Sequence, residues 1–398
     1  MNTKLSFLLI PLVLACFGLL PGAQAVVPAP DGGYPGNNTA EGTNALLNLG
    51  SGVDNTALGF QALFHNTTGN VNTAEGFRAL FNNTSGYQNT ADGASALLSN
   101  TTGYANTATG FHALFFNTTG FFNTASGWAA LGNNSTGSRN TATGIQALFN
   151  NTTGSSNAAN GDVALFSNTT GNQNTADGSG ALLSNTIGHA NTATGFHALF
   201  FNTTGFFNTA SGWAALGNNS TGSDNTAIGT SALQNNTTGT SNAANGFHAL
   251  ISNTIGNGNT ANGYQALKSN TTGDANTANG VNALFNNTTG NENTALGNGA
   301  GNGVTTANNV IAIGAFGLNV SYTTWINNIY GVGTVSSTTL PVIVSENGQL
   351  GTMSSSRRFK KEIKSMDSAS ESILALKPVT FHYKSDPAGA GPQFGLIA

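Results

Sequence analysis

A repeat of seventeen residues runs through most of this chain and constrains its fold more than any other feature. Asparagine recurs every 17 residues from Asn38 to Asn293 without an insertion or a deletion. The consensus is N-T-A-x-G-x-x-A-L-x-x-N-T-T-G-x-x, and residues 55–71, NTALGFQALFHNTTGNV, are one copy. We number the positions of a repeat from 1 to 17, starting at this asparagine. Such a short, uninterrupted period indicates a stacked array in which each unit packs only on its neighbours.

The residues within one repeat favour short strands over helices. Glycine at positions 5 and 15 and asparagine at positions 1 and 12 interrupt any helix every few residues and supply turns. The runs between them predict two strands of three to five residues per repeat. The Ala-Leu pair at positions 8 and 9 is also compatible with a brief helical turn, and the sequence does not decide between the two.

A chain that returns to the same phase every 17 residues predicts an all-β, parallel β-solenoid, or β-roll. Neighbouring coils then pair as parallel strands, and an array of this length extends for about 70 Å. Alanine stacks on alanine and leucine on leucine, and buried asparagines satisfy one another along the axis. Because one coil buries little apolar surface, we expect three chains to share a core as a homotrimer.

Block duplication indicates that the length of the array was adjustable. Gly103–Ser138 and Gly188–Ser223 are identical except for Tyr104 and His189, at an offset of 85 residues, or five repeats. Copying in phase suits a spacer or a stalk better than an enzyme.

The N-terminus is typical of an export signal. Lys4 precedes an apolar run, and Ala23-Gln24-Ala25 fits a small-residue cleavage site, so residues 1–25 are expected to be removed between Ala25 and Val26. A lipoprotein signal at Cys16 ranks second. Residues 26–37 then form a Pro/Gly-rich leader, and the mature chain is predicted to be secreted or held at the cell surface, without cysteine and without a transmembrane anchor.

Candidate chemistry within the array (residues 38–303) is sparse. His112, His197 and His248 share position 7, but they are far apart along the stack, so no metal site is predicted. No cofactor motif and no basic patch for nucleic acid occurs. We find no paired carboxylates of the kind that a glycan-degrading enzyme needs. Rows of threonine leave an ice-binding surface as a further alternative.

The pattern changes after the last repeat. Residues 304–353 alternate apolar and polar residues between Gly, Asn and Ser, which predicts a β-rich connector. Seven of the eleven Lys and Arg residues of the chain then lie between Arg357 and Lys384. We assign residues 354–398 to a separate, small α+β domain.

The periodic block resembles the head repeats of trimeric autotransporter adhesins and the repeats of bacterial tail-fibre-domain proteins. The resemblance rests on the NTALGFQALFHNTTG pattern and covers about two thirds of the chain. It implies a trimeric β-roll. The period here is longer than is usual in the adhesin heads, so each coil must hold extra residues.

The C-terminal segment resembles the intramolecular chaperone family of phage tail spikes and tail fibres. Ser355, Arg358, Lys360 and Ile363 are followed in order by ILALKPVTFHYK and FGLIA. The family's domain trimerises a fibre, guides its folding and then cuts itself off at its own N-terminal edge. The family's domain continues beyond GLIA, so residues 354–398 are expected to be the N-terminal part of a truncated domain.

The same resemblance assigns roles to individual residues. It makes Ser355 the nucleophile, Lys360 the general base, and the bond between Ser354 and Ser355 the site of cleavage. Arg358 and Ile363 fit the family's pattern as packing and positioning residues. Ser356 with Lys361 has the same spacing, but that register puts Phe359 where the arginine belongs.

These observations together predict an exported structural fibre or adhesin-like stalk. Its C-terminal domain chaperones trimerisation and is removed by autoproteolysis, with no activity on external substrates. A surface glycan or a host receptor is the expected partner. A glycan-degrading or an ice-binding β-solenoid is the alternative.

Overall fold

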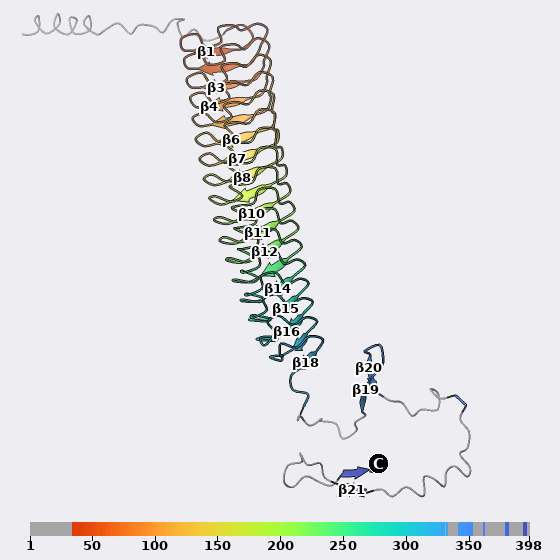
Figure 1. Ribbon diagram of the computed structural model, residues 1–398. Coiled ribbons are helices and arrows are strands. Elements are labelled where there is room, and N and C mark those ends of the chain that lie inside the picture. The colour runs from red at the N-terminus through yellow and green to blue at the C-terminus, as the bar shows by residue number, and fades with distance from the viewer. Residues whose placement is uncertain are drawn as a thin grey trace, which may run out of the picture. The chain divides into compact units, whose positions relative to one another are not determined.

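The computed structural model describes residues 34–330, 332, 341–352, 361–362, 379–381 and 393–395. Residues 34–330 form a continuous parallel β-solenoid, in which each coil lies directly on the preceding one (Figure 1). The described residues contain no helix, so the predicted all-β solenoid with 17-residue coils is confirmed.

Each coil contributes one strand of three residues to a single parallel sheet. The strands of this sheet are β1 Thr39–Glu41, β2 Thr56–Leu58, β3 Thr73–Glu75, β4 Thr90–Asp92, β5 Thr107–Thr109, β6 Thr124–Ser126, β7 Thr141–Thr143, β8 Ala158–Asn160, β9 Thr175–Asp177, β10 Thr192–Thr194, β11 Thr209–Ser211, β12 Thr226–Ile228, β13 Ala243–Asn245, β14 Thr260–Asn262, β15 Thr277–Asn279, β16 Thr294–Leu296, β17 Ile311–Ile313 and β18 Thr324–Ile326.

The register of the sheet follows the sequence period. Thr56 pairs with Thr73 and Ala57 with Ala74, and the same offset of 17 holds from β1 to β17. The ladder therefore continues past Gly303, where the sequence repeat ends. Val310 takes the place of the position-1 asparagine in the coil of β17, and the step from β17 to β18 is shorter, with Ile311 opposite Thr324.

The rest of each coil is made of turns, so the prediction of two strands per repeat is wrong. Positions 7 and 9 adopt left-handed backbone angles, as at Gln61 (φ 56°) and Leu63 (φ 50°). Alternation of left-handed and ordinary residues also excludes the brief helical turn. The buried leucine accepts this conformation because its N–H then donates to the next coil, as from Leu63 to the carbonyl oxygen of Ala79 at 3.0 Å.

The core of the solenoid is a thin apolar column inside one chain. Positions 3, 8 and 9 supply it, and Ala57, Ala62 and Leu63 are fully buried, as are their counterparts in the later coils. The single chain thus closes its own core, and no sharing between chains is needed to cover these side chains.

Two ladders of buried asparagine complete the interior, as the sequence predicts. At position 1, Nδ2 of Asn72 donates to Oδ1 of Asn55 at 3.0 Å and to the carbonyl oxygen of Gly86 at 2.9 Å. At position 12, Nδ2 of Asn83 donates to Oδ1 of Asn66 at 2.8 Å. These amides satisfy one another from coil to coil, which offsets the cost of burying them.

Glycine at position 15 is required by close approach of the coils. A Cβ on Gly69 would collide with the carbonyl oxygen of Gly86 and with the amide of Asn66. The asparagine ladder and the invariant spacing of the coils therefore both depend on this glycine.

Residues 331–398 form a second unit. Its described strands are β19 Val342–Val344 and β20 Leu350–Thr352, which pair antiparallel, and β21 Val379–Phe381 and β22 Gln393–Gly395, which also pair antiparallel. Within the described residues, no helix is long and apolar enough to cross a membrane.

Candidate functional site

The residues predicted to carry the self-cleavage chemistry lie outside the described residues. These are Ser354, Ser355, Arg358, Lys360 and Ile363. The predicted signal cleavage site between Ala25 and Val26 also lies outside them. Of the alternative pair, Ser356 is not described, and Lys361 is exposed. The structure therefore leaves these assignments as predictions.

The three position-7 histidines are packed against aromatic rings. His112, His197 and His248 each stack on the phenylalanine that precedes them, with ring centroids 3.7 to 3.8 Å apart. Burial against these rings lowers the pKa of each histidine, and Lys268 lowers that of His248 further. Among the described residues, no group of three His, Cys, Asp or Glu lies together.

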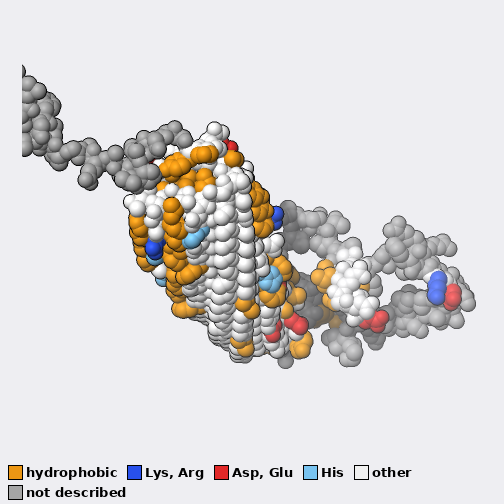
Figure 2. Space-filling model, turned by 90° about the horizontal axis from the view of Figure 1, so that it is seen from above, with side chains coloured by type: hydrophobic (Ala, Val, Ile, Leu, Met, Phe, Trp, Pro, Cys, Tyr) orange, Lys and Arg blue, Asp and Glu red, His pale blue; other side chains and the backbone are white. Residues whose placement is uncertain are grey.

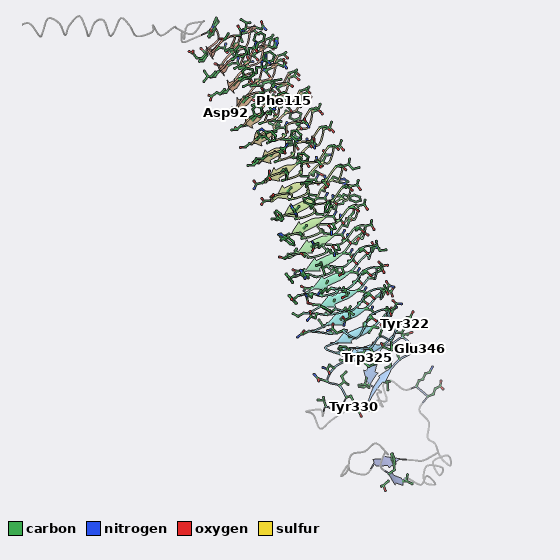
Figure 3. All side chains as sticks on the ribbon, turned by 60° about the vertical axis from the view of Figure 1, so that its left-hand side comes forward. Asp92, Phe115, Tyr322, Trp325, Tyr330 and Glu346 are labelled. Atoms are coloured by element: carbon green, nitrogen blue, oxygen red, sulfur yellow. The ribbon has the colours of Figure 1, made fainter. Side chains whose placement is uncertain are left out.

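The outer face of the sheet holds a pair of carboxylates that the sequence analysis did not identify. Position 4 points outward, and the register places Glu75 opposite Asp92 on adjacent strands (Figure 3, where Asp92 is labelled). Both side chains are exposed. Residues 17 apart in sequence are nearest neighbours in this fold, and that signal was available in the sequence. A catalytic pair also needs a groove that holds a sugar chain between the two groups, and these two lie on a sheet face.

Aromatic side chains form columns on the surface, because the same position recurs in every coil. Phe60 stacks on Phe77 at 5.4 Å and Phe64 on Phe81 at 5.2 Å between ring centroids. In Figure 2, orange hydrophobic side chains lie in columns beside the white backbone and the other side chains. These contacts stabilise neighbouring coils and leave apolar surface exposed to solvent.

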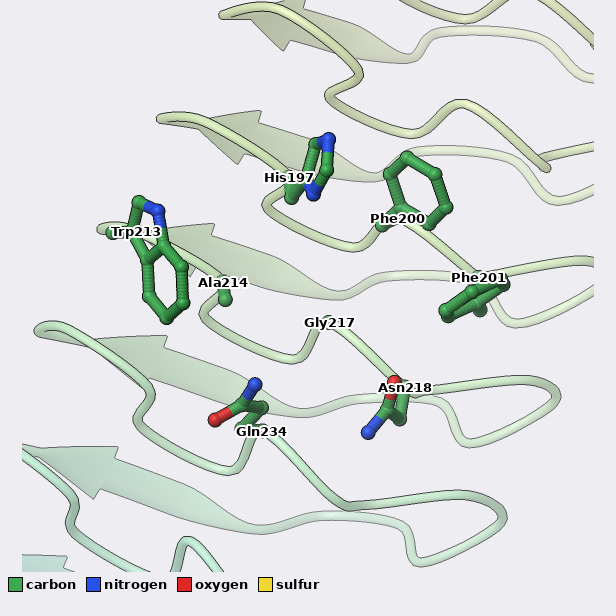
Figure 4. Close-up of a pocket in the computed structure, with 8 residues that line it drawn as sticks. All are labelled: His197, Phe200, Phe201, Trp213, Ala214, Gly217, Asn218 and Gln234. Atoms are coloured by element: carbon green, nitrogen blue, oxygen red, sulfur yellow. The ribbon is translucent and has the colours of Figure 1, made fainter.

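Two hollows interrupt the aromatic surface. One, of about 260 Å³, lies over Ala214 and Gly217 and is bordered by His197, Phe200 and Trp213 (Figure 4). The other, of about 200 Å³, lies over the equivalent small residues of the other copy of the duplicated block. Sequence reasoning identified the duplication but missed these hollows; the signal was the segment WAALG, which has small residues at positions 7 and 10.

Comparison with known proteins finds a similarity in the C-terminal segment. Residues 355–398 match the model of the family described as chaperone of endosialidase. Neither a curated protein nor a solved structure matches the chain. The match supports a chaperone domain in this segment, and the β-solenoid with this domain indicates a structural protein of the tail-fibre kind.

Proposed function

We propose that this protein is an exported fibre stalk whose C-terminal segment assembles three copies and is then removed by autoproteolysis. The observation that carries the proposal is the match of residues 355–398 to a chaperone family on a chain whose preceding residues form a long β-solenoid. A stalk must span distance without collapsing, and a solenoid does this because every coil repeats the same contacts.

The solenoid explains why a removable chaperone is useful. Most of its backbone hydrogen bonds between coils join residues 15 to 18 apart in sequence, and nearly identical coils offer many alternative registers during folding. A domain that fixes where stacking starts prevents such errors. Once the stack is formed, its coils unfold only by breaking many hydrogen bonds together, so the stalk persists by a high barrier to unfolding.

The proposed cleavage is an acyl shift followed by hydrolysis. In the proposed step, Lys360 acts in its neutral form and accepts the proton of the Ser355 hydroxyl. Oγ then attacks the carbonyl carbon of Ser354, and the Ser355 nitrogen leaves and takes up a proton. Water hydrolyses the resulting ester, which leaves a carboxylate on Ser354 and a free amine and hydroxyl on Ser355.

Substitution of the proposed nucleophile tests the cleavage. In the complete gene product, Ser355→Ala should abolish the shorter band on a denaturing gel, and Lys360→Met should do the same. Ser356→Ala is the matched control and should be processed normally. Processing that is unchanged in Ser355→Ala would refute the assignment, and loss of processing in Ser356→Ala alone would move the nucleophile to that residue.

Assembly and export are tested separately. Light scattering of the processed stalk should give three times the mass of one chain, and a monomer at micromolar concentration would contradict the trimer. N-terminal sequencing of the exported protein should begin at Val26, whereas an intact Met1 would contradict removal of the signal.

A further inference from the structure

We propose that the two hollows of the aromatic surface each bind one ring of a neutral glycan. The inference rests on the proposed function in one respect, since it takes the solenoid to be displayed outside the cell. It goes beyond that function by naming the residues and the chemical class of the ligand. Figure 4 shows the larger hollow, with its side chains arranged around Gly217.

The hollows exist because one coil in each duplicated block has small residues at positions where other coils carry large side chains. Between Leu47 and Asn302, position 10 is glycine in two coils only, at Gly132 and Gly217. All the remaining coils carry Phe, Leu, Ile, Gln, Lys or Asn there. The three atoms nearest to a Cβ on Gly217 would all be backbone atoms of Ala214, the closest at 3.1 Å, and none would belong to a side chain. Position 7 of the same coils is also small, at Ala129 and Ala214, so a shallow space opens between bulky neighbours.

The walls of the larger hollow are aromatic rings held in place by their neighbours. His197 lies 4.3 Å from Phe200, and Phe200 meets Phe201 edge-on at 4.6 Å, all between ring centroids. The indole of Trp213 is half exposed at the rim. Preformed ring faces of this kind fit the C–H face of a sugar ring, which is apolar although its edge carries hydroxyls.

The same geometry is built twice. In the other hollow, His112 lies 4.5 Å from Phe115, and Phe115 meets Phe116 edge-on at 4.6 Å. The block duplication thus kept the histidine and the two phenylalanine rings in the same arrangement.

The polar groups at the hollow are side-chain amides. Nδ2 of Asn218 donates to Oδ1 of Asn235 at 2.9 Å, which leaves its second N–H available. The amide of Gln234 makes no side-chain hydrogen bond within the described part of the chain. Amides both donate and accept, and so do sugar hydroxyls, so the two kinds of group are complementary.

The lack of charged side chains in the hollow favours neutral ligands. No Lys, Arg, Asp or Glu is among its lining residues. Burial lowers the pKa of His197, so its ring is uncharged at neutral pH. Nothing in the lining compensates the charge of a sialic acid or a phosphate, whereas a neutral hexose ring needs no such partner.

The two hollows differ at two places, and these differences predict unequal affinity. Trp213 lines the larger hollow, whereas the equivalent Trp128 is not among the residues that line the smaller one. Phe149 occupies the position that Gln234 has in the larger hollow, and its ring lies 2.8 Å from where a Cβ on Gly132 would be. The hollow at Gly132 is therefore smaller and lacks that amide. Five coils separate the two sites, about 24 Å along the stack, so one polysaccharide can engage both with a gain in avidity.

The test is binding of the full chain to neutral polysaccharides, namely glucan, mannan, galactan and chitin oligosaccharides, by isothermal titration calorimetry. Gly217→Phe restores the side chain that position 10 carries in many other coils, so it should fold normally and fill the larger hollow. We expect it to weaken binding about tenfold, because an aromatic contact and its amide partners are lost. Adding Phe116→Ala, which removes an exposed aromatic wall of the smaller hollow, should abolish binding. Ile251→Phe, at position 10 outside both hollows, is the matched control and should bind as the unmodified chain does.

Each other outcome overturns the proposal. It fails if none of these glycans binds at millimolar concentration, if Gly217→Phe binds as well as the control, or if a sialylated glycan is preferred. It also fails if Gly217→Phe disrupts self-association of the chain and no glycan competes for that surface, because the occupant is then a second copy. Ser355→Ala should bind glycans normally, so loss of processing and loss of glycan binding are separate results.

Discussion

Replacing one asparagine in the middle of the position-1 ladder should open the stack locally. Nδ2 of Asn174 donates to Oδ1 of Asn157 and to the carbonyl oxygen of Gly188, and its Oδ1 accepts from the backbone N–H and Nδ2 of Asn191. In Asn174→Leu, two buried donors are left without a partner: the Asn191 backbone N–H and one N–H of the Asn191 side chain. The Gly188 oxygen still accepts from Asn185, and Oδ1 of Asn157 still accepts from the backbone N–H of residue 174. At about 1–3 kcal/mol for each unpaired donor, the local cost is roughly 2–6 kcal/mol.

Hydrogen exchange of the neighbouring coils measures this cost directly. A loss of about 3 kcal/mol corresponds to roughly a hundredfold faster exchange of amides such as that of Thr192. Thr175→Val changes the next residue, whose side chain is exposed, and should alter exchange little. If Asn174→Leu exchanges at the same rate as Thr175→Val, the asparagine ladder contributes no net stability and the reasoning is wrong.

Two further predictions concern close packing and pH. Gly171→Ala puts a methyl group against the carbonyl oxygen of Gly188 and should lower the melting temperature by several degrees. Gly258→Ala is the control: its Cβ would have no atom closer than 3.9 Å, and although its backbone is left-handed (φ 65°), Ala105, Ala190 and Ala275 adopt the same conformation at this position, so the change should be small. Equal melting temperatures would contradict the packing argument. Stability should also fall on acidification, because burial lowers the pKa of three histidines in the folded chain: His112, His197 and His248. As pH falls below about 6.5, the unfolded chain binds more protons than the folded chain does. The contribution of the three neutral histidines to the free energy of unfolding is therefore complete above that pH, decreases below it, and levels off under the folded-state pKa values. Melting curves between pH 8 and 5 measure this, and glutamine at all three positions, as in Gln61, should reduce the slope; an unchanged slope would exclude the histidines as its cause.

The repeat made most of the fold predictable. A constant period of 17 implies the parallel register, and apolar residues at positions 3, 8 and 9 imply the core, so Ala57 and Leu63 could be placed inside before the structure was known. The asparagine ladders followed from the same stacking, because a buried amide that recurs at one position has its own copy as neighbour.

Backbone conformation was the part that residue types could not predict. Leucine rarely adopts a left-handed conformation, yet Leu63 does so at φ 50°, because hydrogen bonds between coils override its local preference. The two hollows could not be predicted from the consensus for a related reason. They depend on what is missing at Gly132 and Gly217 relative to the neighbouring coils, and a consensus hides such differences.

The side-chain amides of the asparagine ladders also have their dipoles aligned along the axis of the solenoid. Every amide of the position-1 series donates toward the N-terminal end of the stack, from Asn55 to Asn38 through to Asn276 to Asn259, and the position-12 amides do the same. Their dipoles add, and each polarises the next, so an amide in a long stack is held more strongly than one in a short stack. Duplication of coils therefore reinforces the coils that were already present, and a longer stalk is a more cohesive one.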